Sequence, residues 1–206
     1  MNDADFRLSN FSLRTQQYYP KHQVRIGLGD NSLANVLTVQ LQPAAQIKDK
    51  DAVSGALKHV GLLDDAFRTS TEIVKDESPE TNYALFEELV GIMKPRLIVA
   101  CGEGAMGFVR NKKVLRWNRH IGKKFKADNL PYTTCVAVTN PFDYGFATAS
   151  PRLKDQGRRE WQFVEQTYTN IISAEFGDIT IQEIQGKKDS MYGWVWYTVG
   201  VRETTD

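Results

Sequence analysis

Cysteine and histidine are scarce in this chain of 206 residues, and their scarcity limits the chemistry that it can support. The two cysteines, Cys101 and Cys135, show no Cys-x-x-Cys spacing, and the three histidines are His22, His59 and His120. This composition argues against a zinc site and a disulfide framework, and we expect neither a metal nor another cofactor. Because each cysteine falls in or at the end of an apolar run, we expect reduced core thiols in a cytoplasmic protein.

Long apolar runs and a strong charge imbalance are absent as well. No stretch approaches the roughly 18 apolar residues of a membrane span, and the N-terminal sequence MNDADFRLSN lacks the basic start and apolar core of a secretion signal. We therefore expect no membrane association. With 26 basic and 25 acidic residues, the formal net charge is +1. This balance excludes a surface that is basic throughout, but it leaves room for a local basic groove.

Basic residues do gather in two parts of the chain. The first cluster lies between Arg110 and Lys126, where acidic residues are nearly absent, and the second lies between Arg152 and Arg159. Two interpretations remain open, namely solvated faces or contact with phosphates. Under the second interpretation, the residues that we expect to contact DNA phosphates are Arg116, Arg119, Lys123 and Arg152.

Strand and helix patterns alternate through the middle of the sequence. Apolar side chains at helical spacing occupy residues 82–93, and the buried-type strand 97–100 and a small-residue turn follow. Further strands are expected at 36–41, 69–75 and 132–139, and further helices at 51–62, 103–109 and 156–172. The alternation predicts the α/β class, with a three-layer α/β/α domain around a central, mainly parallel, four-stranded sheet.

The two ends of the chain show different patterns. Residues 1–34 are polar and irregular, and we interpret them as an N-terminal extension of the α/β domain at 35–172. In the segment 173–206, two alternating runs at 179–184 and 192–201 flank a Gly-Lys-Lys-Asp turn, which predicts a C-terminal β-hairpin packed on the same domain. The exposed edge of such a hairpin also suits a protein partner.

Four short motifs occur in an order that resembles the uracil-DNA glycosylase superfamily. Residues 40–43 read Gln-Leu-Gln-Pro where the family has Gly-x-x-Pro, and residues 70–75 read Ser-Thr-Glu-Ile-Val-Lys where it often has Ile-Thr-Asn-Val-Val-Lys. Residues 94–102, Lys-Pro-Arg-Leu-Ile-Val-Ala-Cys-Gly, are similar to the family's third strand. Its fourth motif, His-Pro-Ser-Pro, has two candidate registers here, at 139–141 and at 148–152.

The resemblance implies a site at the strand ends that receives a flipped base. The catalytic positions would be Gln42, which orients a water molecule, and Asn140 or Thr148, which contacts the base or stabilises the leaving group. Reading or stacking on the base would fall to Glu72, Pro43, Phe142 and Tyr144. The account depends on one geometric expectation, that Gln42, Glu72 and the segment 140–150 converge around a cavity for a nucleobase.

Departures from the family motifs leave several roles open. An ionised Glu72 offers only hydrogen-bond acceptors, which suits a base edge with two donors and not uracil. An equal alternative is that Glu72 is an exposed carboxylate paired with Lys75. Phe142 and Tyr144 form either a stacking platform or loop anchors packed on the core. His120 is either a reactive residue of the basic loop, as in one branch of the superfamily, or a surface histidine.

Two functions follow from these residues. The first is a monofunctional DNA glycosylase, a hydrolase that removes a modified or mispaired base other than plain uracil from single- or double-stranded DNA. The second is a catalytically inactive module of the same fold that binds nucleic acid, a nucleotide or a protein. The amide at Gln42 and the missing histidine in the fourth motif favour the second function, whereas amide-based active sites in the superfamily favour the first.

Overall fold

The computed structural model describes residues 3–27, 34–41, 52–145 and 150–176, with only the backbone described at 144 and 145. The chain divides into two compact units, Met1–Val164 and Glu165–Asp206. The first contains the sheet, and the described part of the second, residues 165–176, is helical. The predicted C-terminal hairpin lies outside the described residues. Among those that are described, no helix combines the length and the apolar character needed to cross a membrane.

The first unit is built on a five-stranded, mostly parallel sheet with the strand order β2-β1-β3-β5-β4. The parallel strands are β1 (Val36–Gln40), β2 (Ala66–Ser70), β3 (Leu97–Cys101) and β5 (Thr134–Val138). The α/β class and the mainly parallel sheet are thus confirmed. The expected number of four strands is wrong, because a short strand, β4 (Lys123–Phe125), pairs antiparallel with β5 at the edge. The sequence did not predict β4 because its three residues, Lys-Lys-Phe, are too few to show the alternation of apolar and polar side chains that marks a strand.

Six α-helices and one 3-10 helix, η2, accompany the sheet in the described residues. They are α1 (Asp3–Tyr18), α2 (Ala52–His59), α3 (Pro79–Met93), α4 (Glu103–Arg110), η2 (Trp117–Arg119), α5 (Pro141–Gly145) and α6 (Pro151–Phe176). The sequence analysis did not predict α1, because its polar sequence buries only Phe11 and Thr15, one turn apart. Two buried positions give too weak a periodic signal for a helix to be recognised from sequence alone.

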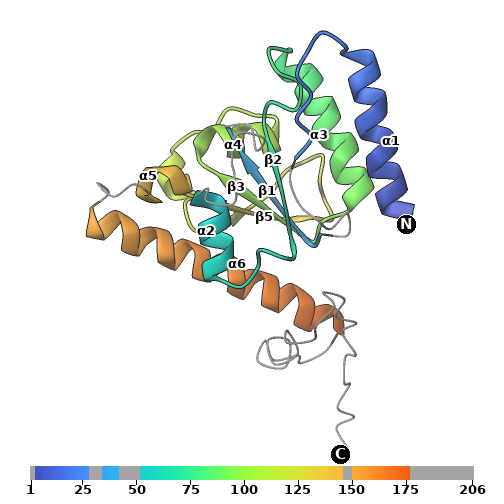
Figure 1. The fold of residues 1–206 in the computed structure, drawn as a ribbon. Helices are drawn as coiled ribbons and strands as arrows, with labels where there is room; N and C mark the ends of the chain where they lie inside the picture. Colours follow the sequence, from blue (N-terminus) through green and yellow to red (C-terminus); the bar gives the residue numbers. More distant parts are fainter. Residues whose placement is uncertain (1–2, 28–33, 42–51, 146–149, 177–206) are drawn as a thin grey trace, which may run out of the picture. The chain divides into compact units, whose positions relative to one another are not determined.

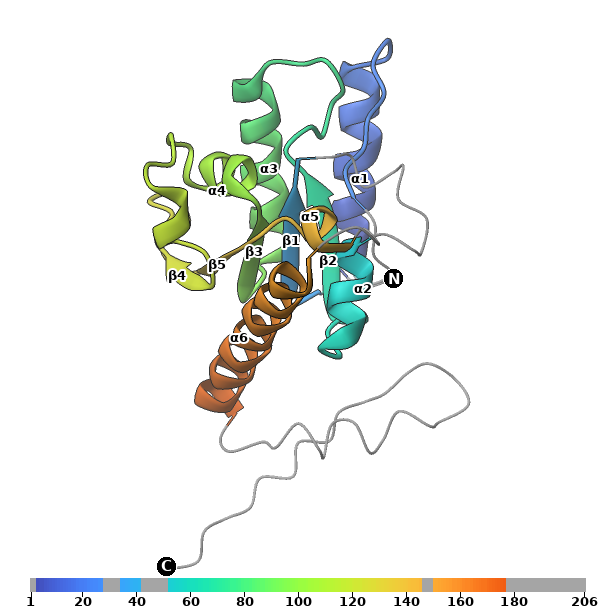
Figure 2. The same cartoon turned by 90° about the vertical axis from the view of Figure 1, so that its left-hand side faces the viewer.

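The central strands are buried on both faces. Every residue of β1, β3 and the last four residues of β5 is buried, as expected for parallel strands that helices cover on both sides. Leu37, Val39 and Ile98 share one apolar cluster with Phe86 of α3 and Met106 of α4. Since side chains alternate along a strand, the neighbours of these residues face the opposite side, where α2 and α5 lie (Figures 1 and 2).

The parallel register aligns the ends of the strands. Gln40, the last residue of β1, pairs with Ser70 of β2 and with Cys101 of β3, and Cys101 in turn pairs with Val138 of β5. These four residues, Ser70, Gln40, Cys101 and Val138, define what we call the carboxyl edge of the sheet. β1 lies between β2 and β3, so the chain leaves β1 toward one edge of the sheet to form β2 and then crosses toward the other edge to form β3. Open parallel sheets bind their ligands at the carboxyl ends of the strands where the strand order reverses in this way.

Both cysteines are core residues in the reduced state. Cys101 and Cys135 are buried and form no disulfide. Burial raises the pKa of the Cys135 thiol to about 12. The thiol is therefore protonated at neutral pH and has little nucleophilic character.

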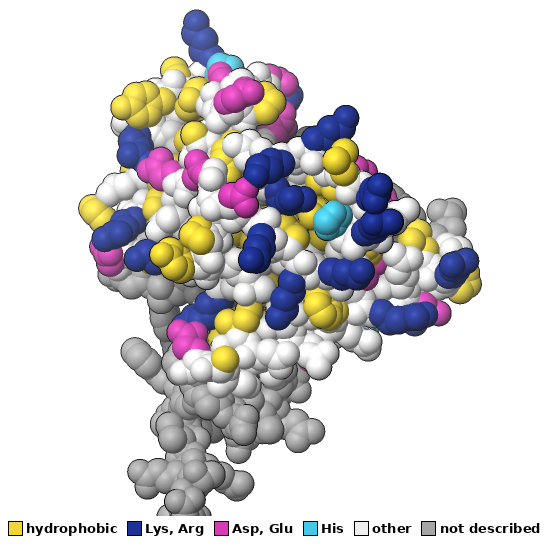
Figure 3. Space-filling view, turned by 180° about the vertical axis from the view of Figure 1, so that it is seen from behind, with side chains coloured by type: hydrophobic (Ala, Val, Ile, Leu, Met, Phe, Trp, Pro, Cys, Tyr) yellow, Lys and Arg dark blue, Asp and Glu magenta, His cyan; other side chains and the backbone are white. Residues whose placement is uncertain are grey.

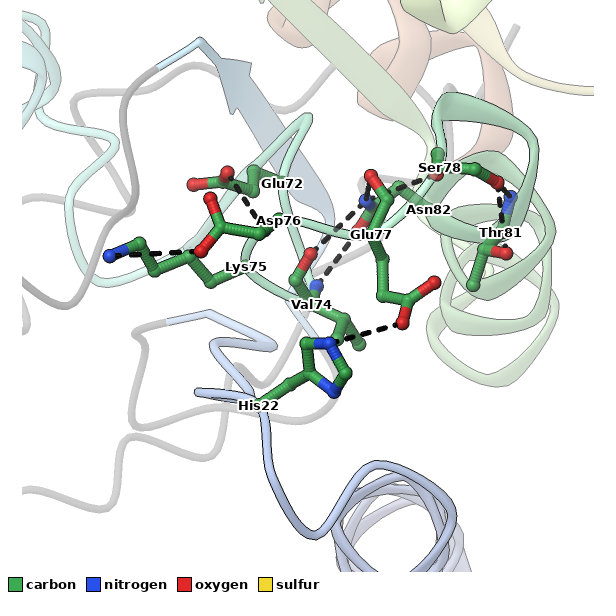
Figure 4. A network of polar contacts seen from close by, with 9 residues as sticks. All are labelled: His22, Glu72, Val74, Lys75, Asp76, Glu77, Ser78, Thr81 and Asn82. Carbon is green, nitrogen blue, oxygen red and sulfur yellow. Dashed lines mark hydrogen bonds and ion pairs between the residues drawn. The ribbon is translucent and has the colours of Figure 1, made fainter.

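The start of α3 is held by a buried asparagine. The amide oxygen of Asn82 accepts the backbone N–H of Val74 at 2.8 Å, and its Nδ2 donates to the carbonyls of Val74, Glu77 and Ser78 at 3.2–3.3 Å. Ser78 caps the helix, because its side chain accepts the N–H of Thr81 at 3.1 Å (Figure 4). Asn82 thus fastens the segment after β2 to α3.

We expect Asn82→Ala to lower the free energy of unfolding by about 2–3 kcal/mol, because several buried backbone groups lose their partner at once. Ser78→Ala serves as the matched control at the same helix end, and it should cost about 1 kcal/mol through loss of the cap alone. Urea denaturation of both variants measures the difference. Equal losses in the two variants would contradict the role assigned to Asn82.

Candidate functional site

Asn140 lies at the carboxyl edge, two residues beyond β5. Its Oδ1 accepts the backbone N–H of Phe142 at 3.2 Å, so the side chain caps α5, and its Nδ2 has no hydrogen-bond partner among the described residues. A Cβ atom added at Gly102, the residue after β3, would lie 3.4 Å from the Asn140 Cβ. Gly102 has a φ of +99°, which favours glycine. Asn140 therefore abuts the end of β3.

A buried carboxylate fixes the backbone just before Asn140. Glu160 of α6 is 5% exposed. One of its oxygens accepts the N–H of Thr139 at 2.6 Å, and the other accepts the Thr139 hydroxyl at 2.9 Å and Nε2 of Gln156 at 2.8 Å. Three donors satisfy the carboxylate, so Glu160 acts here as a clamp that holds the residue preceding Asn140 in one position.

Arg152 lies near this clamp at the start of α6. Arg152, Gln156 and Glu160 are spaced four residues apart, so they share one face of the helix. Gln156 and Glu160 both contact Thr139. The exposed Arg152 lies one helical turn before Gln156, on the same face of α6. The helix begins after Ser150, whose Oγ accepts the N–H of Leu153 at 3.3 Å.

Part of the first basic cluster, at the start of β4, also lies next to the carboxyl edge. Gly122 donates its N–H to the carbonyl of Ala137 at 2.8 Å, and Lys123 pairs with Ala137 in the antiparallel ladder. A Cβ atom added at Gly122 would lie 3.6 Å from Cγ of Glu160. The loop that leads into β4 therefore ends beside the last residues of β5 and the clamp.

We call the exposed cations of this loop, Arg116, Arg119 and Lys123, the basic loop. Within the described part of the chain they form no ion pair, whereas Lys112 is bonded to Asp128. The view from behind shows Lys and Arg side chains gathered across this face around a histidine, with few acidic side chains between them (Figure 3). His120 is partly buried, and its imidazole has no partner among the described residues. The structure thus brings the basic loop and Asn140 to the same end of β5.

Glu72 lies at the other end of the carboxyl edge, two residues beyond β2. Its carboxylate is half-buried, lies 3.9 Å from Nη1 of Arg25, and accepts the N–H of Asp76 at 3.3 Å. Lys75 pairs with Asp76 (Figure 4), whereas the cation that faces Glu72 is Arg25. Neighbouring strands lie about 4.8 Å apart, so the ends of β2 and β5 are separated by roughly 14 Å.

The other predicted site residues fall partly outside the structure. Gln42, Pro43 and Thr148 lie outside the described residues, and of Tyr144 only the backbone, in α5, is described. Phe142 is partly buried in α5. Two hollows that the described residues do form lie between α1 and α3, and no residue of the carboxyl edge lines either of them. The expected convergence with Gln42 therefore stays a prediction.

Sequence reasoning missed Gln40, the last residue of β1. Gln40 is 1% exposed, and neither its amide oxygen nor its amide nitrogen has a hydrogen-bond partner in the described structure. A buried polar group without a partner costs about 1–3 kcal/mol. The signal in the sequence was a polar residue that closes an otherwise mostly apolar strand.

The described residues contain no group of three or more His, Cys, Asp and Glu side chains placed to hold a metal ion. Comparison with models of known protein families gives no match, and comparison with curated protein sequences gives no match either.

We expect Glu160→Gln to lower the free energy of unfolding by about 1–3 kcal/mol, because the new NH2 group faces donors that need an acceptor. Asp155→Asn is the control on the same helix. It removes an exposed ion pair with Arg158 and should change stability by less than about 0.5 kcal/mol. Urea denaturation of both variants makes the comparison, and a loss no greater than in the control would contradict the clamp.

Proposed function

We propose that the protein binds DNA through the basic loop and receives a flipped base, modified or mispaired and not plain uracil, at the carboxyl edge of its sheet. The observation that carries this proposal is the position of the basic loop and Asn140 at the same end of β5. Cations at the rim of a strand-end site suit a ligand with a phosphate backbone and a base that turns inward.

Exposure and charge support the phosphate contacts. Arg116, Arg119 and Lys123 are exposed, so they can reach a phosphate without the cost of leaving a buried environment. Arg152 extends the same positive rim from the start of α6. Arg116 itself has a φ of +58°, which turns the chain sharply into η2.

The family resemblance adds a chemical step to the proposal. As in the resemblance, Gln42 orients the attacking water, and the free Nδ2 of Asn140 donates to the base or to the negative charge that develops on it as it leaves. An amide cannot act as a general base, so bond breaking relies on stabilisation of the leaving base. The three-layer arrangement, the cytoplasmic location and a protein partner at the C-terminal hairpin belong to this proposal as well.

The alternative is a binding module of the same fold without catalysis. The contacts of Glu72 favour it, because a carboxylate that already faces Arg25 and the N–H of Asp76 is less available to read a base. Under either function the basic loop binds the phosphate backbone.

We expect the affinity for a 20-nucleotide DNA to fall steeply with added salt and the double variant Arg116→Ala/Arg119→Ala to bind several-fold more weakly. Its slope of log affinity against log salt should decrease by about 2, because two phosphate contacts are lost. Fluorescence anisotropy over a salt series gives both quantities.

Arg7→Ala/Lys21→Ala is the matched control, since it removes the same charge from α1 and the turn after it. In Figure 2, α1 lies near the β2 end of the sheet, whereas β4 forms the opposite edge. A salt-independent affinity, or an equal loss in the control, would argue against a specific basic loop.

For the chemical step, we expect oligonucleotides that carry one altered or mispaired base to yield abasic sites, detected as strand breaks after alkaline treatment. Asn140→Ala and Gln42→Ala should each reduce the single-turnover rate by 10²–10³-fold or so, as expected when a transition-state contact is lost. Binding without product in the parent protein across the whole panel of bases would favour the alternative function.

A further inference from the structure

The side-chain amide of Gln40 is the feature of the carboxyl edge that the structure leaves unexplained. It is fully buried at the end of β1, which lies between β2 and β3, and neither end of the amide has a partner in the described residues. Buried polar groups in folded proteins are nearly always bonded, so an exception at a strand end points to a ligand.

The spacing between the strand ends that carry Gln40 and Asn140 suits the ring of one base. Gln40 ends β1 and Asn140 follows β5, with only β3 between them, so the strand ends are separated by about 10 Å. The residue after β3 is Gly102, and a Cβ atom added there would lie 3.4 Å from the Asn140 Cβ, so Asn140 lies directly beside the end of β3. Glu72, beyond β2, is one strand farther from Asn140.

We propose that Gln40, and not Glu72, reads the base edge in this site, through a paired donor and acceptor. This inference rests on the proposed function. An amide offers one N–H donor beside one carbonyl acceptor, so it matches a neutral base that presents an acceptor next to a donor. It replaces the expectation of an edge with two donors and the exclusion of plain uracil, because both follow only if the carboxylate of Glu72 reads the base.

The test uses Gln40→Met, which keeps the length and volume of the side chain but removes its polar atoms. Two 20-base-pair duplexes serve as probes, one with a single G·T mismatch and one with a tetrahydrofuran abasic site at the same position. We expect the parent protein to prefer the mismatch and Gln40→Met to lose about tenfold of that preference while it keeps the salt dependence of binding.

The same variant should unfold at a temperature roughly 2–4 °C higher than the parent protein, because an unpartnered buried amide is removed. An amide that was hydrogen-bonded within the fold would give the opposite result, a lower unfolding temperature of Gln40→Met. Thr38→Val is the control, since Thr38 is also buried in β1 with an unpartnered hydroxyl, two residues before Gln40. It should raise the unfolding temperature and leave the base preference unchanged.

The outcomes separate this inference from the proposed function. No binding of either duplex by the parent protein overturns the proposed function and the base reader with it. Salt-dependent binding with an unchanged mismatch preference in Gln40→Met overturns the base reader alone. A lower unfolding temperature of Gln40→Met also overturns it, because the amide would then have partners in the fold.

Discussion

The parallel pairing of β1 with both β2 and β3 is the constraint on which the other features depend. It buries β1 completely and aligns the last residues of three strands at one edge, and the parallel pairing of β3 with β5 adds the fourth. Side chains that follow those strands are then neighbours, although they are about 30 residues or more apart in sequence. The described residues of the candidate site, Gln40, Glu72 and Asn140, owe their positions to that alignment, and the basic loop joins them through β4.

Hydrogen bonds fix the two sides of this edge but not the side chain between them. The β5 side is held by the three hydrogen bonds of Glu160, and the β2 side by the buried amide of Asn82. Between these two clamps lies Gln40, whose amide is unpartnered within the described residues. A stable frame around a group with unmet hydrogen bonds is the arrangement expected of a preorganised binding site, because the ligand then supplies the missing partners.

Much of the fold was readable from periodicity. β1, β3 and β5 lie within two residues of the predicted ranges, and α3 and α4 fall close to theirs, because buried strands and amphipathic helices leave strong patterns. β2 begins three residues and ends five residues before its predicted range of 69–75. The patterns failed for α1, α5 and β4. These elements are short or polar, and the rest of the fold stabilises them more than their own sequences do. For the candidate site, the sequence suggested Asn140 and the basic loop, which the structure brings to the same end of β5, but it did not single out Gln40 or the clamp of Glu160.

The sequence by itself determined the α/β class, the apolar strands and the position of the cations, since these follow from local composition and spacing. Only the tertiary structure decided which polar residues share a site. Glu72 and Gln40 both follow or end a strand, and nothing local distinguishes them. The strand order separates them, because it places Gln40 one strand nearer to Asn140 and turns Glu72 toward Arg25. Which charge is paired and which amide is buried depends on contacts between distant segments, and no local pattern encodes those contacts.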